Sequence, residues 1–213
     1  MTQTSTANAR LYRRGIVLEY ITIAYNVVEA ALSIGFGAAA GSIALVGFGL
    51  DSVIESLSGG VLLWHLRQHG RVHREEEERN EKRAQRLVAV SFLVLGLYVL
   101  FQAVQKLVTA SAPEASLPGI IIAAASIVAM PVLWWLKLTT GRRIGSKALI
   151  ADSKETLVCG LLSVALLIGL GANYVFGFWQ ADPIVGLVIT AFLMREAWEG
   201  WKEAGEKEPE GGE

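Results

Sequence analysis

Long apolar stretches alternate with short polar ones along the whole chain. Six stretches reach about 20 residues, the length that a helix needs to cross roughly 30 Å of hydrocarbon. They cover residues 15–37, 42–66, 87–109, 117–138, 147–171 and 182–201. The pattern predicts an all-α fold, a polytopic membrane protein in which six transmembrane helices form a bundle over residues 15–201.

The sequence outside these spans is short and polar. It consists of an N-terminal segment (1–14), a charged loop (67–86), short connections and an acidic tail (202–213). Apolar residues make up 53% of the chain and the mean hydropathy is +0.44, so the chain is more apolar than an ordinary soluble domain. We therefore expect a multi-pass protein of the plasma or inner membrane, without a separate soluble domain.

Lysine and arginine gather on one side of the predicted bundle. Loops rich in these residues stay in the cytoplasm. The cations on this side are Arg10, Arg13 and Arg14 before the first span, seven in loop 67–86, and Lys137, Arg142, Arg143 and Lys147 after the fourth span. The opposite connections contain no lysine or arginine, and only Lys106 stands near them. Both chain termini are thus predicted to be cytoplasmic.

Ionisable residues within a membrane span are costly, so each one is a functional hypothesis. They occur in the first, second and fifth spans, and we expect uncharged interiors in the other three. In the first span the polar residues recur at steps of three and four, on one helical face: Glu19, Thr22, Asn26, Glu29 and Ser33. Asn26 and Glu29 either line a pathway or hydrogen-bond neighbouring helices.

The second and fifth spans each carry two candidate metal ligands four residues apart. Asp51 and Glu55 share one face of the second span, and Glu155 and Cys159 share one face of the fifth. These helices run in opposite directions. A rise of about 1.5 Å per residue therefore brings Glu55 level with Cys159 near the midplane if the helices touch. Three carboxylates and a thiol in one slab of the bilayer suit a divalent cation.

Each candidate ligand also has a structural interpretation. The acids could form a set that a cation such as Lys154 neutralises, but one lysine cannot compensate three or four carboxylates. Cys159 could be an inert core residue, although its spacing of four from Glu155 favours the ligand. Asp152, one turn nearer the cytoplasm, is either a helix-end group or a further ligand on the way in.

Histidines follow the second span at steps of four. His65, His69 and His73 would align on one face of a helix that runs on into the cytoplasm, where they could collect metal. Gly70 interrupts the series, so we favour a solvated loop helix.

Two other charged features have simple structural explanations. The acidic run at 75–78, followed by several cations, indicates an exposed charged helix. Asp182 precedes Pro183 at the start of the sixth span, which is typical of a helix N-cap.

Taken together, these residues resemble the cation diffusion facilitator family of divalent metal transporters. The similarity lies in LDSVIES, ALIADSKETLVCG, QADPIVGLVITAFLMREAW and AYNVVEAAL, and extends over about residues 10–202. It implies a six-helix bundle with two metal ligands on the second helix and two on the fifth, here Asp51, Glu55, Glu155 and Cys159. Glu155 and Cys159 stand where histidine and aspartate are usual in the family, which leaves the identity of the metal open.

The resemblance implies a secondary transporter that exports a divalent transition-metal cation from the cytoplasm. Carboxylate oxygens with one sulfur favour zinc, and admit cadmium, cobalt, iron or manganese. Desolvation and mutual repulsion favour protonated acids in the empty site, and an arriving cation must displace those protons, which predicts proton antiport. The cation is cargo, and we expect no enzyme activity, catalytic residue, cofactor or nucleic-acid partner.

The sequence leaves the oligomeric state and two other functions open. Many family members carry a cytoplasmic domain that supports dimerisation, whereas this chain ends within about a dozen residues of the sixth span, so a homodimer is not implied. One alternative is a membrane protein that binds metal as a sensor or scaffold without transport. A remote alternative is an intramembrane aspartyl protease, because GFGLD resembles a Gly-x-Gly-Asp motif, but Leu50 intervenes before Asp51.

Overall fold

The computed structural model describes residues 2–68, 74–110, 114, 116–203 and 205, and these residues form helices joined by short turns. The helices are α1 (Thr2–Ala40), α2 (Ile43–Gln68), α3 (Arg74–Thr109), α4 (Leu117–Ile144), α5 (Lys147–Phe176) and α6 (Ala181–Glu203). Within the described ranges there is no strand. The structure therefore confirms the prediction of an all-α, six-helix bundle.

Several helices extend beyond the predicted spans. α1 begins at Thr2, so most of the polar N-terminal segment is helical. α3 begins at Arg74, so the acidic run at 75–78 is helical, as predicted. α3 extends past its apolar residues because its first part, residues 74–86, is rich in glutamate and arginine, which are good helix formers.

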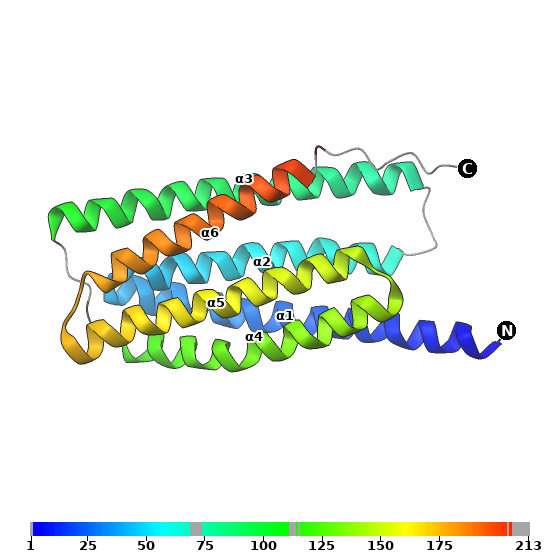
Figure 1. Cartoon of the computed structure of the whole chain (residues 1–213), viewed down its shortest axis with the longest axis horizontal. Coiled ribbons are helices and arrows are strands. Elements are labelled where there is room, and N and C mark those ends of the chain that lie inside the picture. Colours follow the sequence, from blue (N-terminus) through cyan, green and yellow to red (C-terminus); the bar gives the residue numbers. More distant parts are fainter. Residues whose placement is uncertain (1, 69–73, 111–113, 115, 204, 206–213) are drawn as a thin grey trace.

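Among the described residues, five helices have the length and composition to cross a membrane. The apolar segments are Arg10–Ala40, Ile43–Trp64, Phe92–Thr109, Leu117–Ile144 and Ala148–Phe176. α6 is not among them, because Arg195, Glu196 and Glu199 shorten its apolar stretch. It nevertheless packs along α3 as part of the same bundle (Figure 1).

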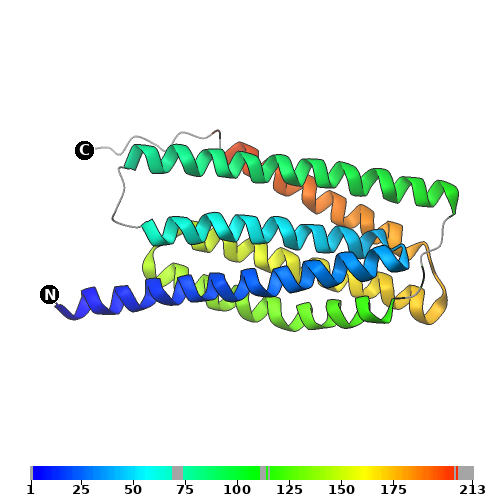
Figure 2. The ribbon, with the colours of Figure 1, turned by 180° about the vertical axis from the view of Figure 1, so that it is seen from behind.

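The two helices with the predicted metal ligands lie at the centre of the bundle. α2 packs against α1, α3, α5 and α6, and α5 packs against α2, α4 and α6. α3 and α6 lie together along one side, whereas α1 and α4 lie along the other (Figures 1 and 2). Polar side chains on α2 and α5 can therefore be surrounded by protein rather than lipid.

Glycines allow α1 and α2 to approach closely near their shared turn. A Cβ atom on Gly37 would lie 2.8 Å from the backbone nitrogen of Val46, and one on Gly49 would lie 2.9 Å from Cβ of Ser33. Such distances leave no room for a side chain. Small residues at the contact thus hold the polar face of α1 against α2.

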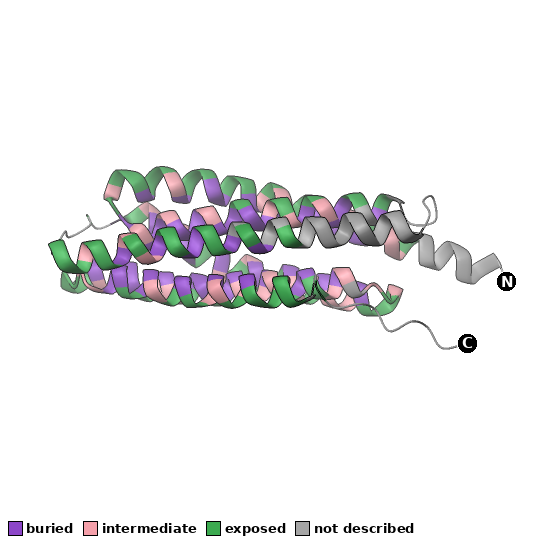
Figure 3. Ribbon diagram, turned by 90° about the horizontal axis from the view of Figure 1, so that it is seen from above, coloured by how far each residue is buried: buried purple, intermediate pink, exposed green. Residues whose placement is uncertain are grey.

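The outward faces of the helices are apolar as well as the inward ones. Phe101, Val128 and Ile168 are 66%, 69% and 66% exposed, while Phe48 and Leu166 are fully buried. Buried positions form stripes on the faces that meet other helices, and exposed positions cover the outside (Figure 3). Exposed apolar surface of this extent is typical of contact with lipid.

Asp182 joins three helices at one end of the bundle. Its carboxylate accepts a hydrogen bond from the backbone N–H of Ile43 at 3.1 Å and another from the hydroxyl of Ser42. It also forms an ion pair with Lys106 at 3.3 Å. The sequence predicted a cap for the helix that contains Asp182, but these contacts go to the start of α2 instead. They do so because the α1–α2 and α5–α6 turns lie at the same end (Figure 1).

The orientation in the membrane stays a prediction, and the structure provides probes for it. Glu114 is exposed between α3 and α4, whereas Arg143 is exposed near the last turn of α4, at the opposite end of the bundle. Because cations gather at the Arg143 end, a cysteine at Glu114 should react with an impermeant thiol reagent applied to intact cells. A cysteine at Arg143 should react only after the cells are permeabilised.

The native Cys159 is buried, so the wild-type chain gives the background for this labelling. The reverse pattern, with Arg143→Cys labelled in intact cells, would overturn the predicted orientation.

Candidate metal-binding site

Three predicted ligands line one cavity between the central helices. Asp51 and Glu55 reach it from α2, and Glu155 reaches it from α5. The cavity has a volume of about 20 Å³, which is room for one water molecule or one bare cation. Its apolar walls come mainly from α3, α5 and α6, through Phe92, Val158, Leu162, Phe192 and Leu193.

The two acids that α2 contributes to this cavity are buried. Asp51 is 8% exposed and Glu55 is 5% exposed. Neither carboxylate oxygen of Glu55 has a hydrogen-bond partner among the described residues. Glu155 accepts one hydrogen bond, from the hydroxyl of Ser58 at 3.2 Å. A buried carboxylate without partners is unfavourable, which marks the cavity as a place where a positive charge or a proton belongs.

A fourth carboxylate, which was not predicted from the sequence, lines the same cavity. Glu196 reaches the cavity from α6, so the expectation of an uncharged sixth span is wrong. The helical period could have indicated this position of Glu196. Ile189, Leu193 and Ala197 are buried on one face of α6, and Glu196 lies three residues after Leu193, next to that face. A glutamate at that position faces the bundle rather than the solvent.

Cys159 lies beside this cavity and faces another acid. It is 1% exposed, and its thiol approaches Oε2 of Glu29 at 3.9 Å. The thiol is also close enough to Glu55 to interact with that carboxylate. Cys159 itself is not among the residues that line the cavity. Both interpretations of this residue, as ligand and as core, therefore remain.

Glu29 connects α1 to two other helices. Its carboxylate accepts a hydrogen bond from Ser52 of α2 at 2.8 Å and another from Ser126 of α4. Ser126 also pairs with the hydroxyl of Tyr25 at 2.9 Å. Asn26, one turn away, is fully buried, and neither atom of its amide has a partner among the described residues. Glu29 thus hydrogen-bonds neighbouring helices, which was one of the two roles considered for it from the sequence.

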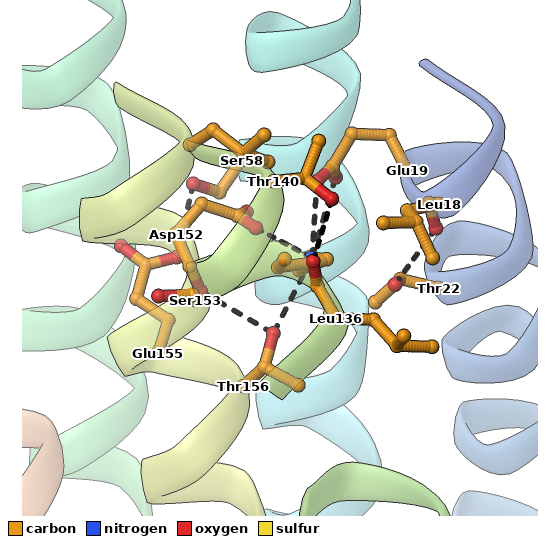
Figure 4. Close-up of polar contacts among 12 residues, drawn as sticks. Leu18, Glu19, Thr22, Ser58, Leu136, Thr140, Asp152, Ser153, Glu155 and Thr156 are labelled. Atoms are coloured by element: carbon orange, nitrogen blue, oxygen red, sulfur yellow. Dashed lines mark hydrogen bonds and ion pairs between the residues drawn. The ribbon is translucent and has the colours of Figure 1, made fainter. Parts of the chain in front are cut away.

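A second cluster of charge lies between α1, α4 and α5. Nζ of Lys137 lies 2.5 Å from the carboxylate of Asp152 and 3.2 Å from that of Glu19, and it donates to the hydroxyl of Thr156 at 3.3 Å. Glu19, Asp152 and Thr156 converge in Figure 4, whereas Glu155 lies on the other side of α5, towards Ser58. Asp152 and Glu155, which lie three residues apart on α5, therefore belong to two different clusters.

Lys137 corrects two expectations. It was counted with the loop cations, but its side chain is fully buried, while Lys154, the expected counter-ion, is exposed. The helical period could also have predicted the burial of Lys137, because Met130, Leu133 and Lys137 recur at steps of three and four on the buried face of α4. Asp152 is consequently a partner in an ion pair.

The described candidate ligands do not form a closed coordination shell around one point. In the part of the chain that the structure describes, no three histidine, cysteine, aspartate or glutamate side chains stand close enough to hold one metal ion. His65 lies in α2 and its side chain is outside the described set, as are residues His69 and His73. Asp51, Glu55 and Glu155 share a cavity, but they do not surround one point.

The chain is similar to one family model and to several known membrane proteins. Residues 20–206 match the family model described as the cation efflux transmembrane domain. Transmembrane protein 163 of Xenopus laevis is 24% identical over 87% of this chain, and an uncharacterized transporter of Synechocystis is 26% identical over 84%. The manganese efflux system protein of Bacillus subtilis is 24% identical over 86% of this chain.

The matches cover only part of these relatives. The aligned region spans 66% of the Xenopus protein, 58% of the Synechocystis protein and 64% of the Bacillus protein. The chain thus spans less than two thirds of the length of the relatives it matches.

The Lys137 cluster gives a test of stability. Replacing Lys137 by methionine would leave two buried carboxylates without their counter-ion. Breaking a buried pair in this way costs about 3–5 kcal/mol. We expect the Lys137→Met variant to lose that much unfolding free energy in a denaturant titration in mixed micelles.

Lys154→Met is the matched control, because Lys154 is exposed on α5, and it should change the unfolding free energy by less than about 0.5 kcal/mol. Equal losses in the two variants would show that Lys137 does not stabilise the bundle through its ion pairs.

Proposed function

Given that the chain belongs to the cation efflux family, we propose that it is a secondary transporter which moves a divalent transition-metal cation out of the cytoplasm. Members of this family are transporters rather than enzymes, which removes the basis for the intramembrane protease alternative. The metal is accordingly a substrate, and no cofactor is required. The family and the long apolar helices make the protein an integral, multi-pass membrane protein, and its bacterial efflux relatives favour the cell membrane.

One observation supports the proposed site most directly. Both oxygens of Glu55 are buried without partners in a cavity that Asp51 and Glu155 also line. A divalent cation in this cavity would supply the missing partner for Glu55 and relieve the repulsion among the three acids. The proposed binding site is therefore built from α2 and α5, with Asp51, Glu55 and Glu155 as ligands that draw together around the ion.

The choice of cation depends on the fourth ligand. Zinc is the cargo expected if Cys159 turns its thiol from Glu29 towards Glu55, because zinc accepts both carboxylate oxygen and thiolate sulfur. A site made only of carboxylates suits manganese better. The relative from Bacillus subtilis is named for manganese efflux, which favours the second possibility for this chain also.

Proton antiport follows from the charge balance of the cavity. Four carboxylates line it, and no lysine or arginine is among its described lining residues. The empty cavity would be neutralised by protons, and the loaded cavity by the cation. If protons enter from outside when the cation leaves, the inward proton gradient drives export.

Transport by purified protein in liposomes tests this function. Liposomes are loaded with a metal-sensitive or a pH-sensitive dye, and Zn²⁺, Mn²⁺ or Cd²⁺ is added outside. Wild-type protein should give saturable uptake of at least one cation together with proton movement in the opposite direction. Asp51→Asn, Glu55→Gln and Glu155→Gln should each reduce uptake by about tenfold or more, since each removes a charged ligand.

Glu199→Gln is the matched control, because Glu199 is exposed on α6 and pairs with Arg195 at 2.7 Å. It should transport like the wild type. Saturable binding without uptake would favour the sensor or scaffold alternative. Uptake that survives all three ligand substitutions would show that the cation follows another path.

A further inference from the structure

The cavity of the proposed site has a carboxylate on α6 that lies at the depth of Glu55. The bond between the backbone of Ile43 and Asp182 fixes the starts of α2 and α6 at the same level. At about 1.5 Å per residue, Glu55 lies roughly 18 Å along α2 from Ile43, and Glu196 lies roughly 21 Å along α6 from Asp182. The two glutamates are therefore level to within about one helical turn.

The surroundings of Glu196 match this position. It lines the same cavity as Asp51, Glu55 and Glu155, and it is partly buried. Its charge interacts with those of Asp51 and Glu155, from two different helices. Glu199, one turn further along α6, is exposed and pairs with Arg195. The two glutamates of α6 thus have different environments although they are three residues apart.

An acidic cluster alone does not establish a cation site, and the unpaired atoms of Glu55 supply the second observation. Glu55 is 5% exposed, and both of its oxygens lack partners while it lines the cavity. Glu196 brings the carboxylates that line this cavity to four, and no lysine or arginine is among the described lining residues. The arrangement is unfavourable as protein packing and favourable as a cation site.

We propose that Glu196, rather than Cys159, is the fourth ligand of the transported cation, and that this cation is one that prefers oxygen, such as Mn²⁺. The inference rests on the proposed transport function and specifies its ligand set. Cys159 does not line the cavity, whereas Glu196 does. Four carboxylates and no sulfur form the kind of site that manganese prefers over softer ions. α6 thereby becomes part of the binding site, together with α2 and α5.

Binding of Mn²⁺ to purified full-length protein in detergent, measured by equilibrium dialysis, tests the role of Glu196. Glutamine keeps the shape of glutamate without its charge, whereas aspartate keeps the charge and changes the shape. If Glu196 binds the ion, Glu196→Gln should weaken Mn²⁺ affinity about tenfold or more, and Glu196→Asp by less than about threefold. Glu199→Gln should stay within about twofold of the wild type, because it removes an equal charge from the same helix outside the cavity.

Several outcomes would overturn the inference and leave the transport function standing. Glu196→Gln could bind Mn²⁺ as Glu199→Gln does while Asp51→Asn loses binding. Glu196→Asp could lose as much affinity as Glu196→Gln, which indicates packing rather than charge. Cys159→Ser could weaken Cd²⁺ tenfold, which would make the thiol the fourth ligand. If the wild type binds no divalent cation, the proposed function fails, and the role of Glu196 fails with it.

A measurement on the wild-type chain keeps the test independent of how the variants fold. A carbodiimide modifies accessible carboxylates, and peptide mapping by mass spectrometry reports each position. Saturating Mn²⁺ should protect Glu196 from modification and leave Glu199 reactive. Equal modification of Glu196 with and without Mn²⁺ would contradict the assignment.

Discussion

The burial of carboxylates between apolar helices is the constraint on which this bundle depends. An ionised acid in such surroundings needs a counter-ion, hydrogen-bond donors or a proton. The structure uses a different solution on each side of its central helices. Lys137 balances Glu19 and Asp152, and hydroxyl groups from two helices donate to Glu29. In the cavity between α2, α5 and α6, both oxygens of Glu55 lack a hydrogen-bond partner among the described residues, and no lysine or arginine is among the described lining residues.

This division gives the two sides of the bundle different physical roles. The Lys137 cluster and Glu29 connect α1 and α4 to the central helices through interactions that are complete within the protein. The cavity on the α3 and α6 side lacks positive charge in its described lining. A protein whose acids were all paired internally would be more stable and would have no reason to bind a cation. A buried carboxylate without partners, such as that of Glu55, costs stability, and a bound cation or proton can recover this cost.

The bundle itself could be predicted from the sequence, because long apolar stretches leave few alternatives for a chain in a membrane. It could also be predicted that Asp51, Glu55 and Glu155 lie close together, and the structure places them in one cavity, since their helical spacing and depth depend only on the period of the helix. Charged residues near helix ends were harder to place. From their positions near helix ends, Lys137 and Glu196 look like residues at the membrane surface, and only the buried face of each helix shows that they point into the bundle. The partners of Asp182 could not be predicted, because they depend on which turns meet in the folded bundle.

In the proposed exchange, protons neutralise the empty cavity and a divalent cation neutralises the loaded one. Calorimetry of metal binding in buffers of different ionisation enthalpy measures the protons released per ion, and this measurement requires no membrane. We expect at least one proton to leave for each cation bound between about pH 6 and 8, and we expect this release to fall in Glu155→Gln, which has one acid fewer to deprotonate. Binding without proton release would mean that the acids are already ionised in the empty cavity, and would contradict exchange of a cation for protons.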